Sequence, residues 1–185
     1  MKQKIFILLC TIGICISVHA KKYIVHSPDN KIKVSITADK QLIWSIDYNG
    51  ERILTPSAIQ MNIEGLKIQP GINPVVINAK VDKTNAEQIA VVPVKQKTIR
   101  DQYTQLTLIC KGDYNIIFRV YNNGAAYRFE TVLKQSPIIV NSETVELNLI
   151  DGCKAYWPRE KNQEYITHCE AIFDELKLES LTKEM

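Results

Sequence analysis

The chain has 185 residues, of which 45% are hydrophobic and 23% are charged, with 23 basic residues against 20 acidic ones. This length and composition fit one globular domain with a hydrophobic core of its own. The net charge of +3 is too small to indicate a basic face. The composition therefore argues against nucleic acid as a partner.

The first twenty residues are typical of a secretory signal peptide. Lys2 and Lys4 form a positive start, residues 5–18 are an uncharged and mostly apolar run, and Ala20 closes a cleavage site. The apolar run is shorter than the roughly 20 residues that a membrane-spanning helix needs. We therefore expect cleavage after residue 20, no membrane attachment afterwards, and a location outside the cytoplasm.

Removing residues 1–20 leaves residues 21–185 as the expected mature domain, with 21 basic and 20 acidic side chains. Three cysteines remain in it, Cys110, Cys153 and Cys169. An odd number in an oxidising compartment permits one disulfide, with Cys153 and Cys169 as the conceivable pair. Three unpaired and mostly buried thiols are an equally good interpretation.

Most of the mature chain alternates apolar and polar residues with the period of two that is typical of half-buried β-strands. Asn49-Gly50 is the strongest hairpin signal. Between residues 66 and 100, prolines interrupt short β-branched runs, which predicts edge strands or strands broken by turns. Strands are expected at residues 31–37, 42–48, 52–54, 58–63, 104–110, 114–121, 125–130, 137–140 and 143–149.

The C-terminal part changes character. Residues 169–181 place apolar side chains near helical spacing, which predicts a short helix. About ten short strands before it predict an all-β fold, an antiparallel β-sandwich. Residues 178–185 carry charge and leucine to the terminus with neither a cap nor a turn, so we expect the sandwich to be incomplete at its C-terminal end.

Several segments, in order and at similar distances, resemble the N-terminal domain of glycoside hydrolase family 97. They are residues 27–34, 44–50, 53–57, 100–108, 118–130, 154–158 and 163–165, the clearest being Phe118-Arg-Val-Tyr-Asn-Asn-Gly-Ala-Ala-Tyr-Arg-Phe-Glu130. The resemblance covers about residues 23–165. It implies a β-sandwich of the super-sandwich type, from a secreted, periplasmic α-glucosidase or α-galactosidase that acts on α-linked oligosaccharides.

In that family the catalytic groups lie on a barrel domain that follows the N-terminal sandwich. Glycoside hydrolysis needs two carboxylates that flank the scissile bond, and no pair in this sequence matches them. We therefore expect no catalytic residue and no hydrolytic activity in this chain alone. The resemblance implies a domain that braces the barrel and completes the carbohydrate pocket. A free-standing secreted carbohydrate-binding module and an inert remnant are the alternatives.

The resemblance implies one metal ligand, Glu164, at the position of a glutamate that helps to bind Ca²⁺ in the α-glucosidase branch of the family. Carboxylate oxygens are common protein ligands of Ca²⁺. The family's other ligands lie on the barrel, so calcium is expected only in the full-length enzyme. The alternative for Glu164 is a solvated loop carboxylate.

Two further residue pairs are candidates for binding. Trp157, expected in a proline-bounded loop, is the better candidate to stack on a sugar ring, whereas Trp44 alternates with Ile46 and is expected in the core. Arg119 and Arg128 are expected to pair locally with acids on the sheet. The alternative is that they bind carboxylates across a domain interface.

Overall fold

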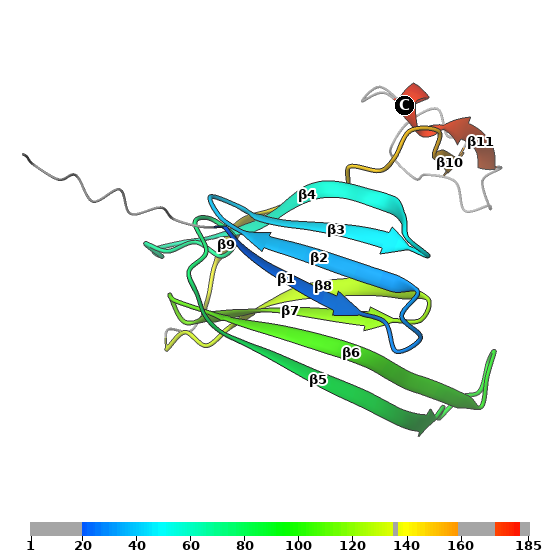
Figure 1. Ribbon diagram of the computed structural model, residues 1–185, viewed down its shortest axis with the longest axis horizontal. Coiled ribbons are helices and arrows are strands. Elements are labelled where there is room, and N and C mark those ends of the chain that lie inside the picture. Colours follow the sequence, from blue (N-terminus) through cyan, green and yellow to red (C-terminus); the bar gives the residue numbers. More distant parts are fainter. Residues whose placement is uncertain (1–19, 135–136, 159–172, 182–185) are drawn as a thin grey trace, which may run out of the picture.

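The computed structural model describes residues 20–134, 137–158 and 173–181. Two antiparallel sheets face each other in it (Figure 1), which confirms the predicted all-β sandwich. The five-stranded sheet has the order β1 (Lys21–His26), β2 (Ile32–Ala38), β3 (Leu42–Tyr48), β4 (Glu51–Ile63) and β9 (Val140–Val145). The four-stranded sheet has the order β5 (Val76–Ile89), β6 (Thr98–Cys110), β7 (Tyr114–Tyr121) and β8 (Gly124–Thr131).

A third, two-stranded sheet lies beyond β4 and outside the two facing sheets (Figure 1). It pairs β10 (Lys154–Pro158) with β11 (Phe173–Lys177), and the short 3₁₀-helix η1 (Leu178–Ser180) follows. Within the described ranges there is no helix of the length and apolar character that crossing a membrane requires.

The hydrophobic core lies between the two large sheets, because alternate residues of a strand point to the same face. β2 shows this alternation without a break, with every second residue buried and the others half-buried. β6 and β7 supply the opposite side of the core. The core residues of these three strands are Ile32, Val34, Ile36, Ala38, Leu106, Leu108, Cys110, Tyr114, Ile116, Phe118 and Val120.

Trp44 is part of this core, as its alternation with Ile46 predicted. The residue is 5% exposed. Its ring lies 5.5 Å from that of Tyr127 in an edge-on arrangement and 6.2 Å from that of Phe118, a geometry that stabilises aromatic pairs beyond their burial. Trp44 is thereby excluded as a surface that stacks on sugars.

β4 carries a proline in its interior, and the strand has a bulge there. Trp44 pairs with Ser57 and Ile46 with Leu54, so β4 has one residue more than β3 over this stretch. A bulge is where a sheet tolerates proline. The chain after β9 supplies a hydrogen-bond partner at this bulge: the Asn148 side-chain amide donates to the Pro56 carbonyl at 2.8 Å.

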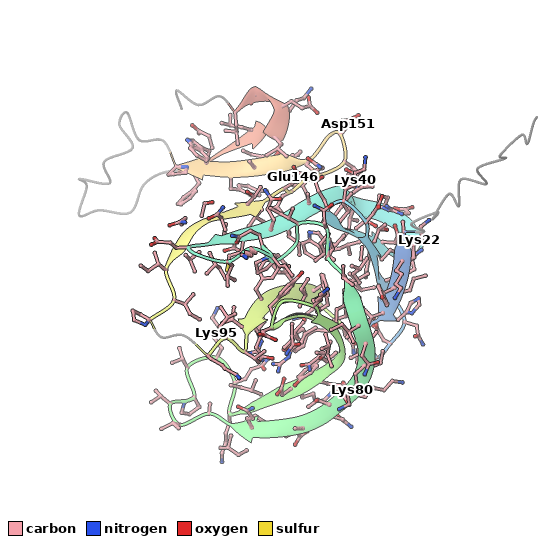
Figure 2. The ribbon with its side chains drawn as sticks, turned by 90° about the vertical axis from the view of Figure 1, so that its left-hand side faces the viewer. Lys22, Lys40, Lys80, Lys95, Glu146 and Asp151 are labelled. Carbon is pink, nitrogen blue, oxygen red and sulfur yellow. The ribbon has the colours of Figure 1, made fainter. Side chains whose placement is uncertain are left out.

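Glu146, labelled in Figure 2, binds β4 two residues after Pro56, at Ala58. Its backbone N–H donates to the Ala58 carbonyl, and its carboxylate accepts from the Ala58 N–H at 2.9 Å. Within residues 137–149, only Val140–Val145 form a strand, β9, and the segment after it is joined to β4 by backbone and side-chain hydrogen bonds. The expectation of two separate strands in this region is wrong.

The region between residues 66 and 100 also differs from expectation. β5 is one continuous strand of 14 residues at the edge of its sheet. The prediction of an edge strand in this region is therefore correct, and the alternative prediction of strands broken by turns is wrong. Pro70 and Pro74 precede the strand, and Pro93 lies in the turn after it. The prolines thus delimit a long hairpin, because proline is excluded from a paired interior.

The helix expected at residues 169–181 is wrong over its described part. Residues 173–177 form β11, which pairs along its whole length with β10, and only the three residues of η1 are helical. Helical spacing in a short segment is a weak local preference, and pairing with a neighbouring strand overrides it. Residues 169–172 lie outside the described residues.

Candidate functional site

The β10–β11 hairpin contains the segment on which the candidate metal ligand and sugar platform were predicted. Its register pairs Lys154 with Lys177 at one end and Pro158 with Phe173 at the other. The connection from Pro158 to Phe173 contains Glu164 and lies outside the described residues. The hairpin thereby holds together the two ends of the segment that bears Glu164.

The two faces of this hairpin differ in exposure. One face presents Tyr156, which is 67% exposed, and Phe173, which is 60% exposed. Tyr156 pairs with Glu175 and Phe173 with Pro158, so the two aromatic residues are diagonal neighbours across the strands, within reach of each other for long side chains.

Trp157 lies on the other, half-buried face, opposite Asp174. The expectation that it occupies a loop is wrong, because Lys154–Pro158 is a strand; its role as a sugar platform stays a prediction. Sequence reasoning missed Tyr156 and Phe173 as an exposed pair. The alternation of residues on β10 predicts that Tyr156 and Trp157 lie on opposite faces of the hairpin. Only the pairing of β10 with β11 shows that Phe173 lies on the same face as Tyr156.

Glu175 fixes the orientation of Tyr156. The Tyr156 hydroxyl donates to the Glu175 carboxylate at 2.9 Å, and Lys154 forms an ion pair with the same carboxylate. The hydrogen bond from Lys154, followed by that from Tyr156, lowers the pKa of Glu175. The hydrogen bond and charge of Glu175 in turn raise the pKa of Tyr156. At neutral pH the face therefore carries an ionised acid beside a neutral phenol.

The described residues do not form a calcium site by themselves. No group of three His, Cys, Asp or Glu side chains among them is placed to hold a metal ion, and Glu164 lies outside that set. Ca²⁺ takes six to eight oxygen ligands, so a site that used Glu164 would need ligands from elsewhere. The metal role of Glu164 stays a prediction.

Among the described residues, neither Cys110 nor Cys153 has a disulfide partner. Cys110 is a core residue, and burial raises its pKa, which makes the thiol unreactive. Cys169, the conceivable partner of Cys153, lies outside the described residues, and that pairing stays a prediction.

The two candidate arginines have different partners. Arg128 pairs with Glu130 on its own strand at 3.2 Å, which confirms local pairing. Arg119 instead donates from Nε to the side-chain oxygen of Gln105 at 2.8 Å, and its Cζ lies 4.4 Å from the centre of the Tyr103 ring. No described carboxylate lies within 4.0 Å of it, so the expectation of a local acid is wrong for Arg119.

Known proteins share the antiparallel sandwich fold of this chain. The family model described as Glycosyl-hydrolase 97 N-terminal matches residues 25–185. The chain belongs to this family.

Its relatives are much longer proteins. The chain is 35% identical over 133 residues to a retaining alpha-galactosidase of Bacteroides thetaiotaomicron, an alignment that covers 70% of this chain and 19% of that enzyme.

Among solved structures, a family 97 enzyme of Pseudoalteromonas sp. strain K8 in complex with acarbose is 20% identical with a TM-score of 0.64, covering 75% of this chain and 22% of that one. A beta-arabinopyranosidase is also 20% identical with a TM-score of 0.66, covering 76% and 23%. These structures share the fold.

Proposed function

We propose that this chain is the N-terminal accessory domain of a secreted, periplasmic, calcium-dependent α-glycosidase. In that enzyme it braces the catalytic barrel and completes the carbohydrate pocket. The observation that carries the proposal is the β10–β11 hairpin, which stands outside the sandwich, presents Tyr156 and Phe173 on one exposed face, and pairs the two ends of the connection that contains Glu164.

The relatives support this assignment. One is a retaining alpha-galactosidase, and structures of the Pseudoalteromonas enzyme hold acarbose and panose. The chain spans 19% of the length of the first of these and 22% of the second. Such a domain makes up about a fifth of its relatives' length and lacks the two carboxylates that flank the scissile bond in glycosidases. It is suited to shaping a pocket rather than to cleaving the glycosidic bond.

The hairpin side chains have a defined part in this proposal. Aromatic faces bind the C–H faces of sugar rings, and a pocket needs a few placed polar groups beside them. Tyr156 and Phe173 supply the apolar faces, and Glu175 with Lys154 supplies the polar groups. Glu164 would contribute one carboxylate to Ca²⁺, which would orient and neutralise groups beside the sugar.

The test is to express the complete reading frame that contains this chain and to measure release of p-nitrophenol from α-glucosides and α-galactosides. We expect the frame to encode a barrel with paired carboxylates. We expect Glu164→Gln to raise the Ca²⁺ concentration required for half-maximal activity, while Glu146→Gln, on the sandwich, leaves it unchanged. A frame without a barrel, or equal calcium requirements for both variants, contradicts the proposal.

A second candidate function is a free-standing carbohydrate-binding module, and the exposure of Tyr156 and Phe173 favours it. This function predicts that the purified chain binds maltotriose or a galactoside unaided. Tyr156→Ala would then weaken binding about fivefold, the effect of losing roughly 1 kcal/mol of aromatic contact. Tyr48→Ala removes a tyrosine that is 43% exposed on β3 and is the matched control. A flat titration with folded protein excludes this function.

A further inference from the structure

The outward face of the four-stranded sheet is partly buried, which is unusual for a face that points away from the core. Tyr103 is 8% exposed and Ile117 is 4% exposed, and neither belongs to the core cluster. Figure 2 shows the green strands of this sheet following a strong curve. A hollow of about 200 Å³ lies on this face, lined by Ile117, Arg119, Tyr121, Ala126, Tyr127 and Arg128. We call it the Arg119 hollow.

Two guanidinium groups flank the hollow. Arg119 of β7 is directly opposite Ala126 of β8, and Arg128 is opposite Ile117. The two arginines are therefore diagonal neighbours on adjacent strands. Ala126 is a small side chain opposite Arg119, and it leaves room there for another molecule.

The acids that β5 and β8 place on this face already have partners. The Glu130 carboxylate pairs with Arg128 and accepts from the Asn115 amide at 3.1 Å, and Asp82 pairs with Lys80 at 3.0 Å. Arg119 contacts only neutral groups among the described residues, the amide of Gln105 and the ring of Tyr103. A half-buried guanidinium without a counter-charge is ready to bind an anion.

The remaining wall of the hollow is aromatic. The Tyr121 ring lies 5.1 Å from that of Tyr103, tilted by 55°, and Tyr103 is held beneath Arg119. Tyr121 thus offers a positioned ring beside a positioned cation. The volume is below the 300–1,000 Å³ that is usual for drug-sized ligands, so it fits a single small ring rather than an oligosaccharide.

We propose that the Arg119 hollow binds a sugar acid, a single hexuronate unit. The carboxylate pairs with the free N–H groups of Arg119, with Arg128 beside it, and the sugar ring packs against Tyr121. A hexuronate provides both a carboxylate for the Arg119 guanidinium and a ring that packs against Tyr121. A neutral sugar provides only the ring. The inference rests on the four-stranded sheet rather than on the β10–β11 hairpin that carries the proposed glycosidase function, and it stands independently of that function.

The test is an NMR titration of the purified, isotope-labelled chain with D-glucuronate, with D-galacturonate, D-glucose and acetate as parallel probes. We expect saturable shifts of β7 and β8 signals with a hexuronate and much weaker ones with glucose or acetate. Arg119→Gln should weaken hexuronate binding at least about tenfold, the scale of losing a charge-assisted hydrogen bond. Arg119→Lys should be intermediate, because it keeps the charge and loses the planar fork.

Lys22→Gln is the matched control, because it changes the net charge equally and Lys22 lies on β1, in the five-stranded sheet. Lys22 is an exposed residue and does not line the hollow. The hexuronate affinity of this variant should stay within about twofold of the parent, as for surface charges in general. Ala126→Leu fills the hollow without altering charge and should also abolish binding, which keeps the test decisive if Arg119→Gln unfolds.

Three outcomes overturn the proposal. The first is the absence of saturable binding to either hexuronate. The second is equal binding of glucose or acetate, which would show that the sugar and the carboxylate are not both recognised. The third is an equal effect of Lys22→Gln and Arg119→Gln, which would show attraction by net charge alone.

Discussion

Lys33 and Asp47 form an ion pair of 2.6 Å between directly opposed residues of β2 and β3. Asp47 is 5% exposed, although it points to the face away from the core, and Arg52 of β4 binds its other oxygen. Burial by itself would raise the pKa of Asp47, but the hydrogen bonds and charges of Lys33 and Arg52 outweigh it and lower the pKa. The structure thus keeps a buried carboxylate ionised.

We expect Asp47→Asn to lower the free energy of unfolding by about 1–3 kcal/mol at neutral pH. The folded pKa lies below the unfolded value of about 3.9, so the contribution is complete above that value and is lost as the pH falls through the folded pKa. Urea unfolding over a range of pH should therefore show the two proteins converging in acid. Asp82→Asn, which breaks an exposed pair, should cost less than about 1 kcal/mol; equal costs would argue against a special role of Asp47.

Gly71 is required by both its backbone angle and its surroundings. Its φ is +83°, and a Cβ atom there would lie 2.3 Å from the Ile59 carbonyl oxygen. We expect Gly71→Ala to destabilise the domain by more than about 2 kcal/mol. Gly65 has a φ of +74°, and a Cβ atom there would meet nothing within 4 Å, so Gly65→Ala measures the cost of the angle alone, about 1 kcal/mol. Equal shifts in the urea midpoint would refute the steric argument.

Phe118 and Phe173 provide a matched pair of phenylalanines. Phe118 is 1% exposed and packs against Trp44 in the core, whereas Phe173 is 60% exposed on the hairpin. Phe118→Ala should cost about 3–5 kcal/mol by leaving a cavity, and Phe173→Ala should cost less than about 0.5 kcal/mol. Thermal unfolding of both variants checks this difference. A large loss from Phe173→Ala would mean that the hairpin packs on the sandwich in solution.

Ser57 lies at the β4 bulge, and its hydroxyl forms hydrogen bonds there. It is fully buried, donates to the Thr55 carbonyl at 2.8 Å and accepts from the Asn148 N–H at 3.0 Å. Ser57→Ala should cost about 1–3 kcal/mol, because it removes both hydrogen bonds of a fully buried hydroxyl. Hydrogen exchange of the Asn148 amide should accelerate in this variant. Thr144→Ala removes an exposed hydroxyl from the paired strand β9 and should change stability by less than about 0.5 kcal/mol. Unchanged exchange at Asn148 would show that the bulge does not depend on Ser57.

Much of the sandwich could be predicted because its signals are local. The alternation of residues 31–37, the Asn49-Gly50 turn and the strands of residues 104–130 each follow from period two and turn chemistry. The prolines around β5 are also a local signal, because proline is excluded from the paired interior of a strand. Their positions in the sequence do not show whether they interrupt a strand or mark its ends. The helix expected after residue 169 failed for a related reason, since five residues of mixed character adopt the conformation that a neighbouring strand permits.

The sequence by itself determined the fold class, the burial of Trp44 and the membership of the family, because these depend on patterns within single strands and on the order of segments along the chain. Only the tertiary structure decided that Tyr156 and Phe173 share one exposed face and that Arg119 faces Gln105 and Ala126 rather than an acid. Such relationships depend on which residue lies opposite which. A shift of one residue in register would turn every one of these side chains to the other face.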